Sequence, residues 1–336
     1  AGIQAIQNND TKYTPSAGTV ELRKAVCQRL KEDCGVDYEP SQISVSSGAK
    51  PCVYTALRAL VDPGDEVILP APYWVSYIEL IRMVGGVPVV VEASEAEHFK
   101  ITPEKLAAAI TPKTKCMILN NPSNPTGMMY SRSELEAIAK VCVENDLYVI
   151  SDEIYYHLVY DNEEFVSLAA ISPEIKERTL LINGVSKSYA MTGWRIGWVV
   201  APAAMRPYVN KCHQNLTTCA NSFAQAGVVE AFAHADNDVT AMVAEYKRRR
   251  DMVVKWLNDI KGFEAITPAG AFYAFPRISR LGMDGFKFCA WLLEEAGVST
   301  VPGEVFGMPG HIRLAYCRSY DYIEEGMKRI KEAVEK

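Results

Sequence analysis

The chain has 336 residues, of which 49% are hydrophobic and 23% charged, and its formal net charge is -6 at pH 7. This length supports a large buried core, arranged either as two domains or as one domain with an appendage. The acidic balance argues against nucleic acid or an anionic membrane as the main partner, because both attract basic surfaces, and the apolar runs are too short to span a membrane.

Short apolar strands alternate with amphipathic helices along the first two thirds of the chain. The expected strands are 42–45, 66–69, 87–91, 115–119, 147–150, 179–182 and 196–200. The expected helices between them are 19–32, 50–60, 75–83, 103–109 and 133–145. This alternation predicts an α/β fold with a mainly parallel central sheet that is flanked by helices on both faces.

The pattern changes after about Asp236. A long helix over 239–257 is followed by expected strands at 263–266, 271–275, 298–301 and 311–315, with helices at 285–295 and 321–335. We therefore expect a large domain over 1–236 and a smaller α+β domain over 237–336, joined through the long helix. A cleft between the two is the expected site.

Three further features concern the chain ends and the cellular compartment. The first residues resemble the end of a helix without a secretory signal, and we expect that the natural N-terminal segment is missing. The nine cysteines form no Cys-x-x-Cys pair, which indicates reduced thiols and a cytoplasmic protein. The five histidines show no metal-binding spacing, so we expect no metal.

Small and aromatic residues follow the first two expected strands, and ligands of open α/β sheets bind beyond the carboxyl ends of strands. Gly48, Ala49 and Lys50 precede a helix, where backbone N–H groups and the helix dipole favour a phosphate. A plain helix cap explains these residues almost as well. Trp74 would offer an aromatic face to a planar ring, with core packing as the ordinary alternative.

Polar residues follow the fourth and fifth expected strands. Asn124 lies in a turn rich in Asn, Pro and Gly, whose rigid amides would bond a ring oxygen or a carboxylate. Asp152 ends a buried strand, where its ionised form is costly without a cationic partner such as a pyridinium nitrogen. The alternative for Asp152 is an N-cap of the segment that follows.

Lys187 lies among small hydroxyl residues and glycines between two expected strands, eight residues before Arg195. Such an amine suits a Schiff base beside a bound anion, although most lysines are simply solvated. A single cofactor, pyridoxal phosphate, explains Lys187 and the strand-end residues together. It requires a Schiff-base lysine, a carboxylate at the pyridine nitrogen, an aromatic residue on the ring, donors to the ring oxygen and a phosphate cup with a cation.

These requirements are met in turn by Lys187, Asp152, Trp74, Asn124 with Tyr155, and the 47–50 turn with Arg195.

The chain resembles the class I aminotransferases of the fold-type I pyridoxal phosphate enzymes. The resemblance runs in family order over essentially the whole chain, and its motifs are KYTPSAG (12–18), DPGDE (62–66), PYW (72–74), NPSNPTG (121–127), SDEIY (151–155), the segment from Ser186-Lys187 to Gly197, and HIRL (311–314).

The resemblance implies roles for individual residues. Lys187 would hold the cofactor and then move the proton between the substrate Cα and the cofactor, and Asp152 would keep the ring nitrogen protonated. Arg313 would bind the substrate α-carboxylate, and Asn124 would also contact the substrate. Ser186 would assist the phosphate. Tyr13 would reach the phosphate of a neighbouring subunit, so the resemblance implies a homodimer with shared active sites.

The assignments of the family branch and of the substrate are supported by fewer residues. The motifs around Trp74 and Trp194 are most similar to the bacterial-type aspartate aminotransferases, which implies amino transfer from aspartate to 2-oxoglutarate through pyridoxamine phosphate. The side-chain carboxylate of an acidic substrate needs a second cation, and Arg58 is the candidate. The alternative, equally favoured, is that Arg58 is an ordinary surface arginine. The usual N-terminal segment with its glycine-containing substrate loop is absent from this sequence.

Other activities remain open from the sequence. An aromatic, alanine or prephenate aminotransferase would use the same residues, and so would a carbon–sulfur lyase that diverts the same carbanion to elimination. A non-catalytic sensor domain of a transcription regulator is the alternative of another kind. It is the least favoured, because no DNA-binding domain precedes this one and every catalytic position is filled.

Overall fold

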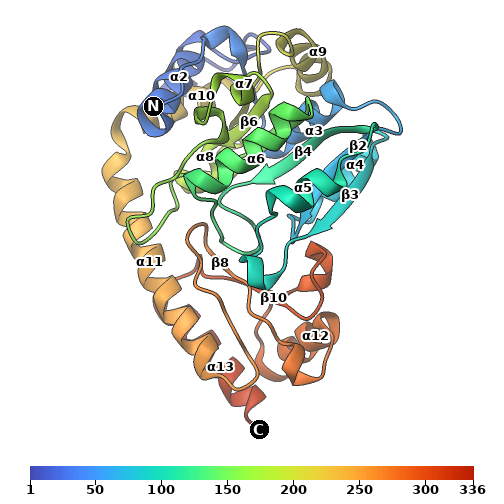
Figure 1. Ribbon diagram of the computed structural model, residues 1–336. Helices are drawn as coiled ribbons and strands as arrows, with labels where there is room; N and C mark the ends of the chain where they lie inside the picture. The colour runs from blue at the N-terminus through green and yellow to red at the C-terminus, as the bar shows by residue number, and fades with distance from the viewer.

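The computed structural model describes residues 1–336 and has two connected parts. Figure 1 shows a central sheet with its helices in the upper part, and a smaller part below it that contains β8, β10, α12 and α13. The long helix α11 (Asp236–Asp259) runs along one edge from the upper part to the lower one. None of the helices combines the length and apolar character that a membrane span requires.

The central sheet has seven strands in the order β1-β7-β6-β5-β4-β2-β3. Their bounds are β1 Ile43–Ser46, β2 Glu66–Ala71, β3 Val87–Glu92, β4 Thr114–Asn120, β5 Tyr148–Asp152, β6 Thr179–Gly184 and β7 Gly197–Val200. Strand β7 is antiparallel to both of its neighbours, and the other neighbouring pairs are parallel. The predicted α/β fold with a mainly parallel sheet is therefore confirmed.

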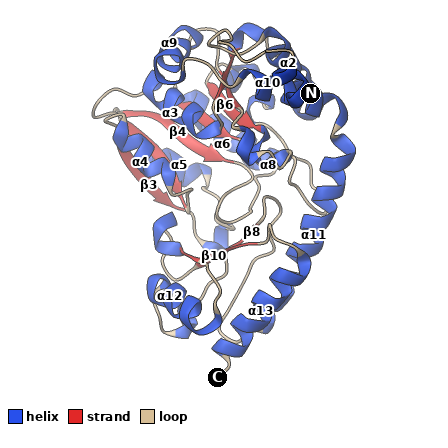
Figure 2. Cartoon of the chain, turned by 180° about the vertical axis from the view of Figure 1, so that it is seen from behind, coloured by secondary structure: helices blue, strands red, loops and turns tan.

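Helices cover both faces of this sheet, as Figure 2 shows with strands in red between blue helices. Buried side chains of α3 (Ala49–Leu60), α4 (Ser76–Met83) and α9 (Arg206–Thr217) pack on one face. The other face is covered by α2 (Val20–Cys34), α5 (Pro103–Ala109), α6 (Arg132–Glu144), α7 (Pro173–Lys176) and α10 (Ser222–His234). Successive residues of β2, Val67 and Ile68, are buried in different cores because strand side chains alternate between faces.

Local sequence sets the ends of several helices. At the start of α6, the hydroxyl of Ser131 accepts from the N–H of Glu134, whose carboxylate accepts from the N–H of Ser131 in return. Asp284 caps α12 (Gly285–Ala296) in a similar way, and Gly297 ends that helix in the left-handed conformation. The short helices α1 (Gly2–Gln7) and α8 (Val185–Ser188) complete the N-terminal part, and α1 confirms the helix expected at the first residues.

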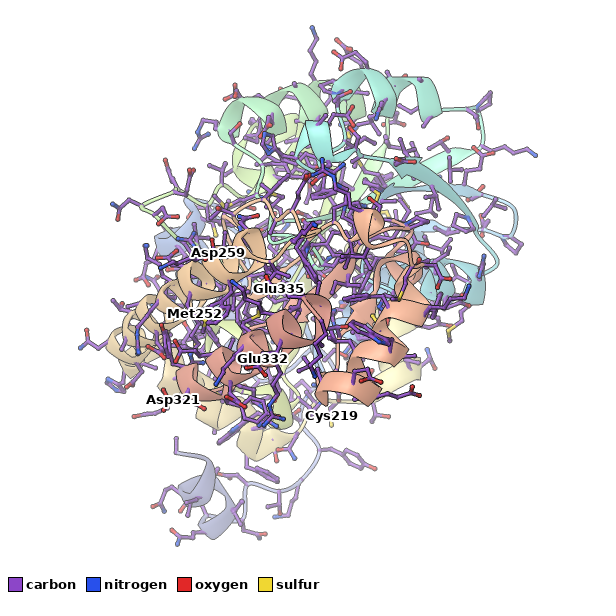
Figure 3. All side chains as sticks on the ribbon, turned by 90° about the horizontal axis from the view of Figure 1, so that it is seen from below. Cys219, Met252, Asp259, Asp321, Glu332 and Glu335 are labelled. Atoms are coloured by element: carbon purple, nitrogen blue, oxygen red, sulfur yellow. The ribbon has the colours of Figure 1, made fainter.

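The C-terminal part has a small antiparallel sheet in the order β8-β10-β9, with β8 Tyr273–Ala274, β9 Val301–Pro302 and β10 Ile312–Ala315. Helix α13 (Tyr320–Val334) packs against α11, and Figure 3 shows the two side by side, with Met252 on α11 and Asp321 on α13. Tyr155 and Tyr160, from the loop after β5, are buried in the same core as these helices. This loop of the N-terminal part therefore packs into the core of the C-terminal part.

One expected strand is absent from the structure, and two helices were not expected. The strand predicted at 263–266 is wrong, because this stretch makes a single antiparallel bridge between Glu264 and Arg277. Pro268 follows closely and has no N–H with which to extend a ladder. Helices α9 and α10 lie between residues 200 and 239, where no element was expected.

Candidate active site

A pocket of about 370 Å³ lies at the edge of the central sheet where the parallel strands end. It is lined by residues of both parts of the chain. Ten of the predicted site residues line it: Ala49, Lys50, Trp74, Asn124, Asp152, Tyr155, Ser186, Lys187, Arg195 and Arg313.

The topology of the sheet explains why these residues meet. Residues beyond the carboxyl ends of β1, β2, β4, β5 and β6 gather at one edge, as in other open α/β sheets. Because β7 runs in the opposite direction, its first residue, Gly197, pairs with Ser46 of β1 and with Gly184 of β6. Arg195, just before β7, is therefore brought to the same edge as Lys187, just after β6.

The turn before α3 forms a cup of backbone atoms. Gly48 has φ +97°, and a Cβ atom there would lie 2.4 Å from Nη2 of Arg195. A Cβ on Gly197 would lie 2.5 Å from the N atom of Ala49, so both glycines are needed for this close approach. No side chain caps the first turn of α3, which leaves its N–H groups available to an anion. Arg195 donates to the carbonyl of Ser47 at 3.2 Å and adds a positive charge beside the cup.

Asp152, the last residue of β5, is buried at the base of the pocket. Its carboxylate accepts from the hydroxyl of Tyr77 at 2.6 Å and from the N–H of Ile154 at 3.2 Å. Burial raises the pKa of Asp152 to about 6, although both hydrogen bonds and the nearby Lys187 act to lower it. A cationic partner that occupied the pocket would favour the ionised carboxylate.

Lys187 lies on α8, immediately after β6, and is half-buried. Its ammonium is 5.3 Å from the ring centre of Phe272. Burial lowers the pKa of Lys187, and the guanidinium groups of Arg313 and Arg195 lower it further, whereas Cys317 and Asp152 have the opposite effect. A larger share of neutral amine, the nucleophilic form, is the consequence.

Arg313 faces the pocket from β10. Its Nη1 donates to Oδ1 of Asn124 at 2.9 Å, and the backbone N–H of Asn124 in turn donates to Oδ1 of Asn120 at 2.8 Å. The guanidinium lies between two aromatic rings, with its carbon 4.6 Å from the ring centre of Tyr273 and 5.0 Å from that of Phe306. The Nε atom of Arg313 is buried and has no hydrogen-bond partner within the chain.

Aromatic residues form another wall of the pocket. The rings of Trp74 and Tyr77 meet edge to face with centres 5.2 Å apart, and the ammonium of Lys50 lies 4.8 Å from the ring centre of Trp74. The hydroxyl oxygens of Tyr155 and Tyr273 are 2.9 Å apart. Ser186, which precedes Lys187, is buried and lines the same pocket.

Two predicted site residues are not brought to this pocket. Arg58 is exposed near the C-terminal end of α3 and lines a separate surface hollow with Lys211 and Asn215. It lies eight residues beyond Lys50, about 12 Å along the helix at 1.5 Å per residue. The expectation that Arg58 supplies a cation is therefore not met within one chain. Tyr13 is 88% exposed and lines another hollow, beside Asn221 and Ser222.

Five pocket residues have no counterpart among the predicted site residues. They are Tyr77 on α4, Asn120 at the end of β4, Ile154 after β5, Thr192 between Lys187 and Arg195, and Tyr273 on β8. Tyr77 follows Trp74 by three residues, nearly one helical turn, and this spacing is a signal by which it could have been found. Tyr273 carries no comparable signal, because its place depends on how the two parts pack.

Comparison with known proteins agrees with this geometry. A family model described as aminotransferase class I and II matches residues 1–330. The aspartate aminotransferase of Bacillus subtilis (strain 168) is 43% identical over 341 residues, which cover 100% of this chain and 87% of that protein. A probable aspartate/prephenate aminotransferase of Aquifex aeolicus (strain VF5) is also 43% identical, over 100% of this chain and 86% of that protein.

Solved structures give the same result. A crystal structure of the aspartate aminotransferase from Rhizobium meliloti superposes with a TM-score of 0.96 at 38% identity, over 99% of this chain and 86% of that one. An aromatic aminotransferase from Pyrococcus horikoshii OT3 also gives a TM-score of 0.96 at 38% identity, over 99% of this chain and 90% of that one. The chain therefore belongs to the class I and II aminotransferases. It is an aminotransferase that acts on amino acids and 2-oxo acids, as the sequence motifs predicted.

Proposed function

We propose that this aminotransferase carries pyridoxal 5′-phosphate on Lys187 and transfers the amino group of aspartate to 2-oxoglutarate. The observation that supports this most directly is the meeting of Lys187, Asp152 and Arg313 in one pocket. They come from α8, β5 and β10, and they supply an amine, a buried carboxylate and a carboxylate-binding guanidinium.

The residues present fit this cofactor. The cup formed by Gly48, Ala49 and Lys50 suits the phosphate group, with Arg195 and Ser186 beside it. Trp74 would contact the face of the ring, and Asn124 and Tyr155 would donate to its ring oxygen. When bound, pyridoxal phosphate supplies an electron sink for the negative charge that develops at the substrate Cα.

Asp152 would bind the protonated ring nitrogen. Without a cation, burial holds the pKa of Asp152 at about 6, well above its usual value of 3.8. A positive N–H group next to the carboxylate would favour ionisation, and the ionised carboxylate would in turn keep the ring nitrogen protonated. Tyr77 and the N–H of Ile154 orient the carboxylate for this interaction.

Arg313, which lines the pocket, would bind the substrate α-carboxylate through the N–H groups of its guanidinium. A carboxylate held in this way fixes the orientation of the bond from Cα to its hydrogen. The Lys187 amine would be the base that takes the proton from the substrate Cα.

Aspartate as the substrate rests on the names of the relatives, several of which are aspartate aminotransferases. Relatives named for aspartate and prephenate, and a structural neighbour named as an aromatic aminotransferase, make prephenate and aromatic amino acids the second candidates. We further propose a cytoplasmic homodimer in which Tyr13 reaches the partner's phosphate site. Arg58 remains a candidate cation only if α3 of one subunit faces the pocket of the other.

A substrate panel tests this proposal. The purified protein would be incubated with pyridoxal phosphate, 2-oxoglutarate and, in turn, aspartate, alanine, phenylalanine or cysteine, and the products measured. We expect oxaloacetate and glutamate from aspartate, at a kcat/KM above that for the other amino acids, and loss of turnover in Lys187→Ala. Phenylalanine reacting as well as aspartate would contradict the substrate assignment, and pyruvate with ammonia from cysteine would indicate a lyase.

A further inference from the structure

Tyr273 links two functional groups of the pocket that belong to different parts of the chain. Its hydroxyl oxygen lies 2.9 Å from that of Tyr155, which belongs to the loop after β5. The centre of its ring lies 4.6 Å from the guanidinium carbon of Arg313. Both tyrosines are buried. Tyr273 thus contacts both Tyr155, the proposed donor to the cofactor ring oxygen, and Arg313, the proposed binder of the substrate carboxylate.

We propose that Tyr273 is a positioning residue whose hydroxyl and ring have separate tasks. The hydroxyl donates to Tyr155 and so strengthens the hydrogen bond from Tyr155 to the cofactor ring oxygen. The ring holds the guanidinium of Arg313 in the plane in which it binds the substrate carboxylate. This inference rests on the proposed function, because it takes the cofactor to be bound at Lys187.

The direction of the hydrogen bond follows from the protons that are present. Burial raises the pKa of both tyrosines, so both hydroxyls keep their protons at neutral pH. An anionic ring oxygen attracts the proton of Tyr155 more strongly than a neutral hydroxyl does. Tyr273, which has no other hydrogen-bond partner, then donates to the oxygen of Tyr155. A hydroxyl that accepts a hydrogen bond becomes a better donor.

The ring of Tyr273 has its own partner. The guanidinium of Arg313 lies between Tyr273 and Phe306, and its Nη1 is engaged by Asn124. Strand β8 pairs with β10 so that Tyr273 lies opposite Ala315, which fixes Tyr273 and Arg313 on one small sheet. The ring thus restricts the tilt of the guanidinium, and this restriction does not involve the hydroxyl.

The test compares Tyr273→Phe, which loses only the hydroxyl, with Tyr273→Leu, which also loses the ring. Two quantities would be measured on the holoenzyme: the pKa of the cofactor–lysine Schiff base from its absorbance, and the dissociation constant of succinate, a dicarboxylate without an amino group. Tyr160→Phe is the matched control, because Tyr160 is also buried and its hydroxyl donates to the carbonyl of Ala271, two residues from Tyr273.

We expect Tyr273→Phe to raise the Schiff-base pKa by about 0.4 to 1 unit, since a weaker bond from Tyr155 lets the ring oxygen hold the imine proton more tightly. Succinate affinity should change less than about twofold in this variant. Tyr273→Leu should show the same rise in pKa and, in addition, bind succinate about 2- to 30-fold more weakly. Tyr160→Phe should resemble the wild type in both measurements.

A double-mutant comparison shows whether the effect passes through Tyr155. In a Tyr155→Phe background, Tyr273→Phe should leave the pKa unchanged. The same shift in that background, or no shift in the single variant, would overturn the inference while leaving the aminotransferase proposal intact. A protein that forms no Schiff-base absorbance with pyridoxal phosphate would overturn the proposed function itself.

Discussion

Asp152 and Lys187 face the same pocket, and burial drives each of them towards its neutral form. Burial raises the pKa of the Asp152 carboxyl to about 6 and lowers that of the Lys187 ammonium. Neutral lysine is the form that attacks a carbonyl carbon, and a cation beside Asp152 would favour its ionised form further. The two shifts are compatible with the proposed cofactor, which has an aldehyde and a basic ring nitrogen.

Tyr77 is one of the groups that limit the rise in the Asp152 pKa. We expect Tyr77→Phe to raise this pKa further, since the hydroxyl donates to the carboxylate at 2.6 Å. The turnover number should fall about 2- to 10-fold, and the acid limb of its pH profile should move to higher pH. Tyr73→Phe is the control, because the Tyr73 hydroxyl makes no hydrogen bond. An unchanged acid limb in Tyr77→Phe would contradict this role.

The sequence was sufficient for residues that follow strands directly. Lys187, Asp152 and Asn124 could be predicted because strand ends in an open α/β sheet point to one edge, whatever the details of packing. Tyr273 could not be predicted in this way, because its position depends on how a two-residue strand of the C-terminal part packs against the loop after β5. The family motif assigned Arg313, but its two flanking rings required the structure.

A second buried acid, Glu153, directly follows Asp152, the last residue of strand β5. Glu153 accepts from the hydroxyls of Ser151 and Ser167, at 2.8 and 2.9 Å. Burial raises the pKa of Glu153 from 4.5 to about 7, so the folded chain holds a proton that the unfolded chain releases. Because the folded-state pKa is the higher one, this contribution to stability is present below about pH 4.5 and is lost as the pH rises to about 7.

Glu153→Gln should remove this pH dependence. The amide keeps an acceptor for the two serine hydroxyls and never ionises. In the cofactor-free protein we expect the variant to be more stable than the wild type at pH 8, by about 1–3 kcal/mol, and nearly equal to it at pH 4.5. Thermal unfolding at the two pH values measures the difference. An equal effect of the substitution at both pH values would refute the buried-acid explanation.

The seven strands of the central sheet were predicted to within two residues at each end, because buried parallel strands are short apolar runs separated by helices. The small C-terminal sheet was harder. Its strands β8 and β9 have two residues each, so they lack the length that gives a strand a recognisable pattern. The strand at 263–266 was wrongly predicted for the same reason, because a run of a few apolar residues is as compatible with a loop as with a strand.

On the scale of the whole molecule, the pocket is built from both parts of the chain, and the proposed dimer would add a third contributor. Tyr13 extends into solvent, with 88% of its surface exposed. A hydroxyl from a partner subunit would satisfy a phosphate oxygen that the cup of its own chain leaves free. The active site would then depend on subunit concentration as well as on folding.

Light scattering should therefore give twice the 37.2 kDa of one chain. Tyr13→Phe should keep this mass but bind pyridoxal phosphate about 10- to 100-fold more weakly, as expected for the loss of a hydrogen bond to a charged group. Tyr322→Phe is the matched control, because Tyr322 is 68% exposed on α13. A monomer with full cofactor affinity would contradict the shared site.

We propose that Lys187 carries the cofactor, although Lys50 lines the same pocket. The protein would be loaded with pyridoxal phosphate, reduced with borohydride, digested and examined by peptide mass spectrometry. We expect one equivalent of pyridoxyl label on Lys187 and none in Lys187→Ala, with labelling retained in Lys50→Ala. Label on Lys50, or no stoichiometric label on Lys187, would contradict the account.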